Sequence, residues 1–147
     1  MRRLRPILLL TLALFLTGAI GGCGANTKKL RTDAEQGNAA AQFTLGVKYR
    51  TGQGVPQDNK TAAKWYRLAA EQGYANAQRN LSVLHAFGLG VPKDYVYAHM
   101  WGNLGASNGN EKGGKLRDLV AKKMTPTDIS AAQKLARECV RKKYKGC

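Results

Sequence analysis

Apolar residues in the middle of the chain recur every three to four positions, which is the spacing of one face of an α-helix. Two such blocks follow one another along the sequence. The first block contains Ala41, Leu45 and Tyr49, and the second contains Ala62, Trp65, Tyr66, Ala69 and Ala70. Lysine, arginine, glutamine and threonine fill many of the remaining positions. The pattern predicts two amphipathic helices, each of which buries one face.

A short turn separates these two helices. Gly52, Gly54 and Pro56 end the first helix, because glycine adopts positive φ at a helix end and proline cannot continue the hydrogen-bond ladder. Asp58 or Asn59 then caps the second helix. This part of the chain therefore predicts a helical hairpin.

The sequence pattern of this hairpin occurs a second time, 36 residues further along the chain. The segment Ala34-Glu35-Gln36-Gly37 returns at residues 70–73, and the linker Gly54-Val55-Pro56 returns at residues 90–92. A fixed period of this length indicates stacked supersecondary units, none of which can bury its apolar face alone. We therefore predict an all-α solenoid of helix-turn-helix repeats. The repeats are expected at about residues 38–73 and 74–109.

The copy degrades after the second repeat. Leu116, Leu119 and Val120 still predict a helix. Thr125-Pro126-Thr127-Asp128 marks the start of a last helix that runs to about Tyr144, because it offers a capping hydroxyl, a proline at the first helical position and an acid three residues past the cap. The expected layout is a signal peptide at 1–22, a tether at 23–28, and the solenoid at 29–147, with a first helix from about Lys29 to Gln36 and a degenerate unit with a C-terminal capping helix at 110–147.

The first residues of the chain have the pattern of an export signal. Arg2, Arg3 and Arg5 precede an apolar run from Ile7 to about Ile20, and small residues follow. The run is shorter than the roughly 20 residues of a comfortable membrane-spanning helix. Removal after export is therefore expected, and an uncleaved anchor is the alternative.

The end of this signal, Ala19-Ile20-Gly21-Gly22-Cys23, resembles the bacterial lipobox. The resemblance implies that Cys23 becomes the mature N-terminus and carries acyl chains as a lipid anchor. More than one acyl chain would hold the protein firmly to a membrane. We expect a lipid-anchored protein on the periplasmic face of the outer or inner membrane. Ordinary cleavage around Ala19 or Ala25 would instead give a soluble periplasmic or secreted protein.

The remaining cysteines, Cys139 and Cys147, are expected to form a disulfide. Export places them in an oxidising compartment, where a pair should bridge. A continuous helix would hold residues eight apart at roughly 12 Å, which is too far for a disulfide. Gly146 can end the helix and let the chain turn back. Two free thiols or a disordered tail are the alternatives.

The chain is strongly basic. It has 24 Lys and Arg against 9 Asp and Glu, a formal net charge of +15, of which +12 lies in the part from Cys23 onward. In a cytoplasmic protein such a charge would suggest nucleic acid. Outside the inner membrane the available polyanions are lipid head groups, lipopolysaccharide and cell-wall polymers. We therefore expect no nucleic-acid partner and consider contact with anionic lipid or lipopolysaccharide, with a solvated basic surface as the alternative.

The repeat from Ala41 to Gly73 resembles the Sel-one-like repeat (SLR) family, which is related to the tetratricopeptide repeats. The resemblance rests on Leu45-Gly46, on the linker Gly-x-Gly-Val-Pro-x-Asp that occurs twice, and on Trp65-Tyr66 before Ala-Ala-Glu-Gln-Gly. It implies a right-handed α/α solenoid, a tetratricopeptide-like superhelix. It also implies a scaffold or adaptor for protein contacts, because members of the family seldom carry a reaction.

Several glycines depart from the family pattern. Gly102 stands where the first repeat has Tyr66, and Gly105 stands where it has Ala69. Each glycine inside a helix costs about 1 kcal/mol relative to alanine. We therefore expect the third unit to be the least rigid.

No catalytic constellation is visible in the sequence. There is no Ser-His-Asp order, nucleophile elbow or phosphate loop, and His85 and His99 have no partner at metal-ligand spacing. Trp65 recurs as Trp101 at the repeat spacing, which favours core packing for these residues and for the neighbouring Tyr66. We therefore expect no catalytic residue, no metal and no cofactor.

A basic face is the one candidate binding feature. In tetratricopeptide relatives the first helices of the repeats line the concave side, and by this analogy alone a set of inward positions can be assigned. These positions are Phe43, Val47, Arg50, Arg79, Val83, Lys112, Lys115 and Lys122. An apolar start that grades into a cationic end suits an extended or acidic partner segment. Ordinary solvated lysines are the alternative.

The function that we expect is a non-catalytic protein–protein interaction scaffold or adaptor of the bacterial cell envelope, which binds an unidentified envelope protein through this basic groove. One alternative is a β-lactam-binding or β-lactamase-like enzyme, because the spacing of Cys139 and Cys147 faintly resembles that of cysteine-rich SLR proteins. The repeats here lack cysteine, however. A module that binds anionic lipid or lipopolysaccharide is the other alternative.

Overall fold

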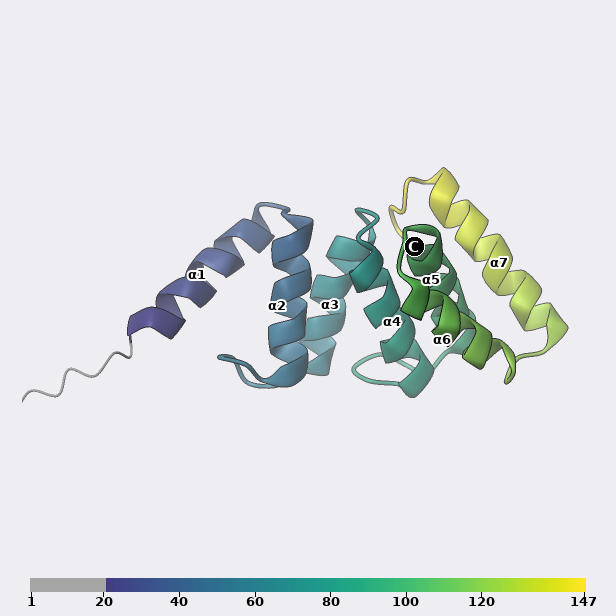
Figure 1. The fold of residues 1–147 in the computed structure, drawn as a ribbon, viewed down its shortest axis with the longest axis horizontal. Helices are drawn as coiled ribbons and strands as arrows, with labels where there is room; N and C mark the ends of the chain where they lie inside the picture. Colours follow the sequence, from purple (N-terminus) through teal and green to yellow (C-terminus); the bar gives the residue numbers. More distant parts are fainter. Residues whose placement is uncertain (1–20) are drawn as a thin grey trace, which may run out of the picture.

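A computed structural model of the chain describes residues 21–147, and this part consists of seven helices and no strand (Figure 1). The helices are α1 (Gly21–Glu35), α2 (Ala39–Thr51), α3 (Asn59–Ala70), α4 (Ala75–Phe87), α5 (Tyr95–Ser107), α6 (Glu111–Ala121) and α7 (Pro126–Arg141). They follow one another along an elongated body, with α1 at one end and α7 at the other (Figure 1). The expected all-α fold of helical repeats is confirmed.

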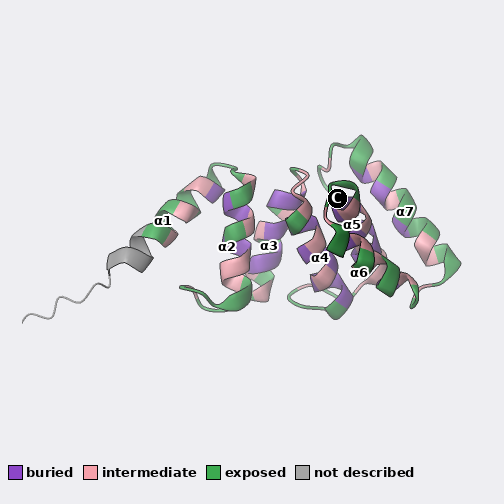
Figure 2. Cartoon of the chain, viewed as in Figure 1, coloured by how far each residue is buried: buried purple, intermediate pink, exposed green. Residues whose placement is uncertain are grey.

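Each repeat is a hairpin of two helices whose facing sides are buried. Helix α2 packs on α3, α4 packs on α5, and α3 also packs on α4, so neighbouring hairpins share one apolar seam. Figure 2 shows the buried residues on the sides of these helices that face one another. Tyr66, Leu81 and Trp101 are almost completely buried in this seam, and Leu45 is equally buried in a smaller cluster with Ala34 of α1. A single hairpin would leave them half uncovered, which is why the units depend on their neighbours.

The two linkers have the same local structure. Asp58 and Asp94 each cap the helix that follows, because the side chain accepts hydrogen bonds from two backbone N–H groups of its first turn. Gly52 and Gly88 close the helices that precede, with φ of 73° and 69° in the left-handed region that favours glycine. Of the two residues that the sequence offers as a cap for α3, the chain uses Asp58.

Two buried glutamines tie successive helices together at the repeat spacing. The side chain of Gln42 donates to the carbonyl oxygen of Ala34 at 3.0 Å and accepts from the side chain of Gln72 at 2.8 Å. Its counterpart Gln78 makes both bonds again 36 residues further on, at 3.1 and 2.9 Å. Each glutamine therefore satisfies both of its polar ends in a buried place.

The glycines of α5 bring three helices into close contact. A methyl group at Gly102 would lie 2.9 Å from the carbonyl oxygen of Gly113 in α6, and one at Gly105 would lie 3.3 Å from the carbonyl oxygen of Ala75 in α4. The backbones of α4, α5 and α6 can approach this closely because no side chain stands between them. The helix propensity that these glycines lack is therefore offset by packing.

Both ends of the helical array differ from the sequence-based expectation. Helix α1 begins at Gly21, so residues 23–28, expected to be a tether, are helical. The helix packs on α2 through Ala34 and Leu30, and its sequence contains no proline that would break it. Helix α7 ends at Arg141 instead of Tyr144, because Lys143 and Tyr144 have left-handed backbones, with φ of 52° and 64°.

Helix α7 begins as the sequence predicts but packs in an unexpected place. Thr125 and Asp128 form a capping box around Pro126 at the start of the helix. In the first two repeats the second helix lies against the first. Helix α7 lies instead against α5 and has little or no contact with α6. The apolar side of α6 is therefore not covered by its own hairpin partner.

Candidate functional site

Helices α2 and α4 and the start of α6 face a common hollow of about 250 Å³, which we call the basic groove. Its lining residues are Phe43, Val47 and Arg50 of α2, Asn76, Arg79 and Asn80 of α4, and Asn110 and Lys112 at the start of α6. The stacking of repeats explains the arrangement, since equivalent positions of successive first helices project to the same side. Phe43 and Arg79, for example, are 36 residues apart.

The groove collects positive charge without a counter-charge. Its lining residues include Arg50, Arg79 and Lys112 and no carboxylate. These three cations form no ion pair with any residue that the structure describes. A hollow of this kind favours an anionic group of a ligand, because its field is not cancelled locally.

The asparagines of the groove hold part of this surface in a fixed orientation. Arg79 donates from Nη1 to Oδ1 of Asn80 at 3.0 Å, and Asn110 donates from Nδ2 to Oδ1 of Asn76 at 2.6 Å. Asn110 also caps α6 by accepting from the backbone N–H of Gly113. Groups that are already ordered lose less conformational entropy when a ligand binds.

The hydroxyl of Tyr66 is a buried polar group close to the groove. The Tyr66 side chain is completely buried, and its hydroxyl oxygen forms no hydrogen bond of good geometry. Burial raises the pKa of Tyr66, while the neighbouring Arg50 and Asn80 oppose this effect in part. Both neighbours line the groove, so the hydroxyl lies behind its wall as a polar group without a firm partner.

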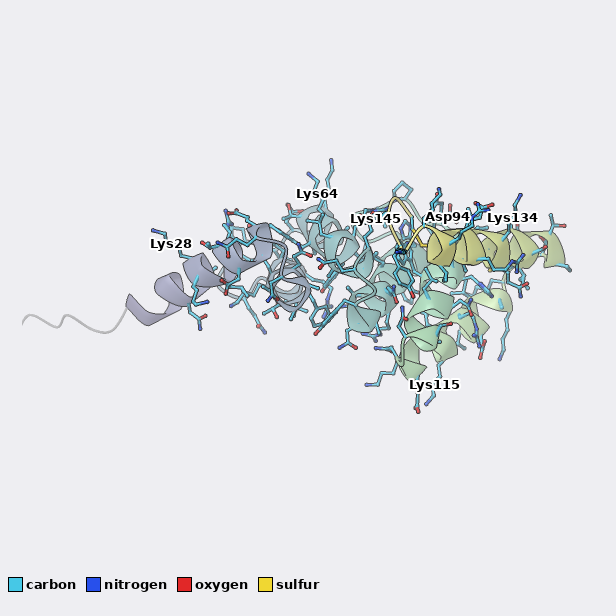
Figure 3. All side chains as sticks on the ribbon, turned by 90° about the horizontal axis from the view of Figure 1, so that it is seen from above. Lys28, Lys64, Asp94, Lys115, Lys134 and Lys145 are labelled. Carbon is cyan, nitrogen blue, oxygen red and sulfur yellow. A yellow bond between two sulfur atoms is a disulfide. The ribbon has the colours of Figure 1, made fainter. Side chains whose placement is uncertain are left out.

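The structure brings together five of the eight residues that the sequence suggested for partner binding: Phe43, Val47, Arg50, Arg79 and Lys112. The other three lie elsewhere. Val83 is half-buried in α4, while Lys115 and Lys122 are exposed and do not line the groove. Figure 3 shows Lys115 projecting away from the body.

Phe43 has a structural role besides its place in the groove. Its ring lies 5.9 Å from that of Tyr66 and 5.2 Å from that of Tyr74, centre to centre, in tilted arrangements. The residue is therefore partly committed to packing, and only its remaining surface is open to a ligand.

Sequence reasoning missed the three asparagines. Asn76 and Asn80 are three residues before and one residue after Arg79, and the four-residue spacing between the asparagines places them on one face of α4. This spacing was the available signal. Asn110 joins them because it caps the next first helix.

The histidines and large aromatic residues belong to the core. His85 and His99 are buried, and the ring of His85 stacks on that of Tyr97 at 5.4 Å. Burial lowers the pKa of both histidines below the ordinary value of 6.5. Trp101 is fully buried, and Trp65 packs against the small cluster beneath α1. Among the described residues no group of three or more histidines, cysteines or carboxylates is placed to hold a metal ion.

The C-terminal residues fold back on α7. A disulfide joins Cys139 to Cys147, with Cα atoms 5.6 Å apart, and Gly146 adopts a left-handed φ of 67° in the turn between them. The hydroxyl of Tyr144 donates to Oδ1 of Asn108 at 3.1 Å, and its ring packs over Gly73. This short segment therefore fastens the end of α7 to the turns that follow α3 and α5.

The expected lipid anchor lies outside the part of the chain whose side chains are described. The expected signal peptide at residues 1–22 falls almost entirely on undescribed residues, and the Cys23 side chain also lies outside the described part. From residue 21 onward, no helix combines the length and hydropathy that a membrane-spanning segment needs.

Helical hairpins stacked at a fixed period, with a groove across their first helices, define an α-helical repeat scaffold. The family model of the Sel1 repeat matches residues 39–74 and 75–110. The chain therefore contains two Sel1 repeats, each a hairpin of the solenoid. Proteins with such repeats generally mediate protein–protein interaction.

Solved structures agree with this assignment. The chain is similar to a protective antigen present in uropathogenic Escherichia coli strains that displays an SLR fold, with 34% sequence identity and a TM-score of 0.76 over 80% of this chain and 26% of that one. It is also similar to a Sel1 repeat protein from Oxalobacter formigenes, with 40% identity and a TM-score of 0.55 over 56% of this chain and 24% of that one. The chain thus spans about a quarter of the length of these proteins. No curated protein matches it significantly.

Proposed function

We propose that the chain is a non-catalytic adaptor of the bacterial cell envelope, which binds an acidic, extended segment of a partner protein in the basic groove. The observation that supports this most is the meeting of Arg50, Arg79 and Lys112 around one hollow that no carboxylate lines. The asparagines of the groove can donate to and accept from a peptide backbone. Both the side chains and the main chain of such a segment would therefore find partners.

The shape of the groove favours an extended segment over a single small anion. The lining residues come from α2, α4 and the start of α6, the first helices of three successive units, so a ligand that contacts all of them must cross the stack. Phe43 and Val47 make the α2 side of the groove partly apolar, while Lys112 lies on α6. A peptide with an apolar residue followed by acidic ones fits this gradient.

Charge reversal in the groove tests the proposal. The variant with Arg50→Glu, Arg79→Glu and Lys112→Glu should lose its partner in affinity capture from envelope extracts, with binding weakened at least tenfold, because like charges would face the acidic segment. Thermal melting would check that the variant keeps its fold.

The matched control carries the same change in net charge on three lysines outside the groove, Lys115→Glu, Lys122→Glu and Lys134→Glu. It should capture the same partner as the wild type. Loss of the partner in both variants, or in neither, would contradict the groove. Binding of both variants and wild type to anionic vesicles with equal, salt-sensitive affinity would instead favour a lipid or lipopolysaccharide contact.

We also propose that the protein is exported and anchored through acyl chains on Cys23. The lipobox-like sequence before this residue supports the proposal. Mass spectrometry of the mature protein should find Cys23 as an acylated N-terminus, and Cys23→Ser should move the protein from the membrane to the soluble fraction. A wild-type protein that begins at another residue would overturn this assignment.

A further inference from the structure

A second hollow, of about 360 Å³, lies where α4 ends, α5 begins and α6 passes beside them. Its lining residues are Ala86, Phe87, Lys93, Tyr95, Leu116, Leu119, Val120 and Lys123. We call it the apolar cavity; it shares no lining residue with the basic groove. Phe87 and Leu119 expose 67% and 58% of their surface, so two large apolar side chains stand open to solvent here.

The rim of the apolar cavity is positively charged. The ammonium group of Lys93 stands 5.0 Å from the centre of the Tyr95 ring. A hydrogen bond from Lys93 and the charge of Lys123 lower the pKa of the Tyr95 hydroxyl, so both lysines reach this side of the cavity. No acidic residue lines it. The rim therefore suits a carboxylate that stands next to an apolar group.

The contact between the two repeats indicates which kind of segment covers the start of a second helix in this solenoid. Gly90 of the second linker packs directly against the backbone of Asn59 at the start of α3, where a methyl group would not fit. Tyr95 is the equivalent of Asn59, 36 residues further on. After α6 the sequence has no Gly-x-Gly-Val-Pro linker that could cover the start of α5 in the same way.

The last helix of the chain does not close the cavity either. Helix α7 lies against α5 and has little or no contact with α6. Met124, in the short turn before α7, packs with Ala86 and Val120 at the base of this region. Phe87 and Leu119 nevertheless remain exposed.

We infer that the apolar cavity docks a short segment of a partner protein in which an aliphatic residue stands next to an acidic one, in the place of the missing repeat linker. The aliphatic side chain packs between Phe87 and Leu119, and the carboxylate lies between Lys93 and Lys123. A second copy of this chain is a poor occupant, because two strongly basic chains repel. The inference shares with the proposed function only the premise that the partner is a protein.

The test uses the full-length protein in nanodiscs of zwitterionic lipid and a fluorescent, end-blocked peptide, Asp-Leu-Gly-Val-Pro-Asp. This probe copies the core of the second linker, Leu89 to Pro92, between two acids. Fluorescence anisotropy should show binding. The charge-reversed peptide Lys-Leu-Gly-Val-Pro-Lys and the polar peptide Asp-Ser-Gly-Ser-Pro-Asp should bind at least tenfold more weakly.

Variants of exposed residues locate the binding place without endangering the fold. Leu119→Asp should weaken binding of the acidic peptide at least tenfold, and Lys123→Glu about fivefold or more. Lys115→Glu, on the same helix but outside the cavity, should bind normally. The basic-groove variant should also bind normally, which separates failure of this inference from failure of the proposed function.

Four results would overturn the inference. The first is equal binding of all three peptides, and the second is loss of binding in the basic-groove variant instead of in Leu119→Asp. The third is displacement of the peptide by decanoate, if decanoate binds more tightly than the peptide. The fourth is self-association of the protein that the Leu119→Asp substitution abolishes. The third result would assign the cavity to a fatty acyl chain, and the fourth to a second copy.

Discussion

One pair of facing residues differs in size between the two repeats. In the first repeat Gly46 faces the ring of Tyr66, and a methyl group at Gly46 would lie only 2.6 Å from this ring. At the same positions 36 residues further on, Ser82 faces Gly102, and Ser82 donates to the carbonyl oxygen of Ala98 at 2.6 Å. A large and a small residue have therefore been replaced by two small ones. The space that this leaves lets α6 approach α5.

Substitution of Gly102 tests whether this approach matters. Gly102→Ala should destabilise the protein by about 1–3 kcal/mol, because its methyl group meets the backbone of α6 and the helices must separate. Gly114→Ala is the matched control. Its methyl group would meet only the Ala106 side chain, at 3.3 Å, and the gain in helix propensity of about 1 kcal/mol offsets this contact. Urea denaturation measures both; an equal loss in the two variants would contradict the argument.

Helix α7 has little or no contact with α6, the helix that precedes it in the chain. It lies against α5 and contributes Ala132, Ala136 and Cys139 to the buried surface. The disulfide and the contacts of Tyr144 fasten its C-terminal end. A cross-link that closes a short loop restricts the unfolded chain and so stabilises the folded one.

Removal of the disulfide should lower the stability of this end of the solenoid. Cys147→Ser should cost about 2–3 kcal/mol, which corresponds to a decrease in Tm of roughly 5–15 °C. Differential scanning calorimetry of the wild type with and without reducing agent should give the same decrease. The variant should not respond to the reducing agent, and a wild type that does not respond either would mean that Cys139 and Cys147 are not joined.

The chain is strongly basic, and its described residues form few ion pairs. Lys28, Lys64, Lys115 and Lys134 project from its surface on different helices (Figure 3). With 24 basic and 9 acidic residues, most of the cations must remain unpaired. Contacts with an acidic partner should therefore weaken as the ionic strength rises.

The pH dependence of stability is also a property of the whole fold. Burial lowers the pKa of His85 and His99, so the folded protein keeps both rings neutral at a pH where the unfolded chain, with a pKa near 6.5, takes up protons. Stability should be complete above about pH 7 and decrease as the pH falls through 6 toward 5. The lowered pKa of Asp58 acts only in a separate window below about pH 4.

Thermal melting between pH 8 and pH 5 measures this effect. The Tm of the wild type should fall over this interval, and the double variant His85→Gln, His99→Gln should have a flatter profile although its Tm at pH 8 is lower. A wild-type Tm that stays constant or rises toward pH 5 would contradict the burial of two neutral histidines.

The sequence by itself determined the repeating part of this protein. The helices of the two repeats, the cap at Thr125, the glycine ends of the first helices and the buried stripes follow from patterns within a few residues, whereas the sequence left the cap of α3 open between Asp58 and Asn59. Such patterns record which face of a helix is apolar and where the backbone must turn. The 36-residue period then fixed the stacking, because equivalent faces of equivalent hairpins must meet.

Only the tertiary structure decided which surfaces meet after the second repeat, where the 36-residue period is no longer kept. The sequence marks an apolar face on α7 but does not state whether it covers α5 or α6, since a local pattern does not identify the neighbour. The same choice leaves Phe87 and Leu119 exposed beside Lys93. Arg50 of α2 and Asn110 at the start of α6 also join the polar residues of α4 only because the stacking of the repeats brings these distant segments together.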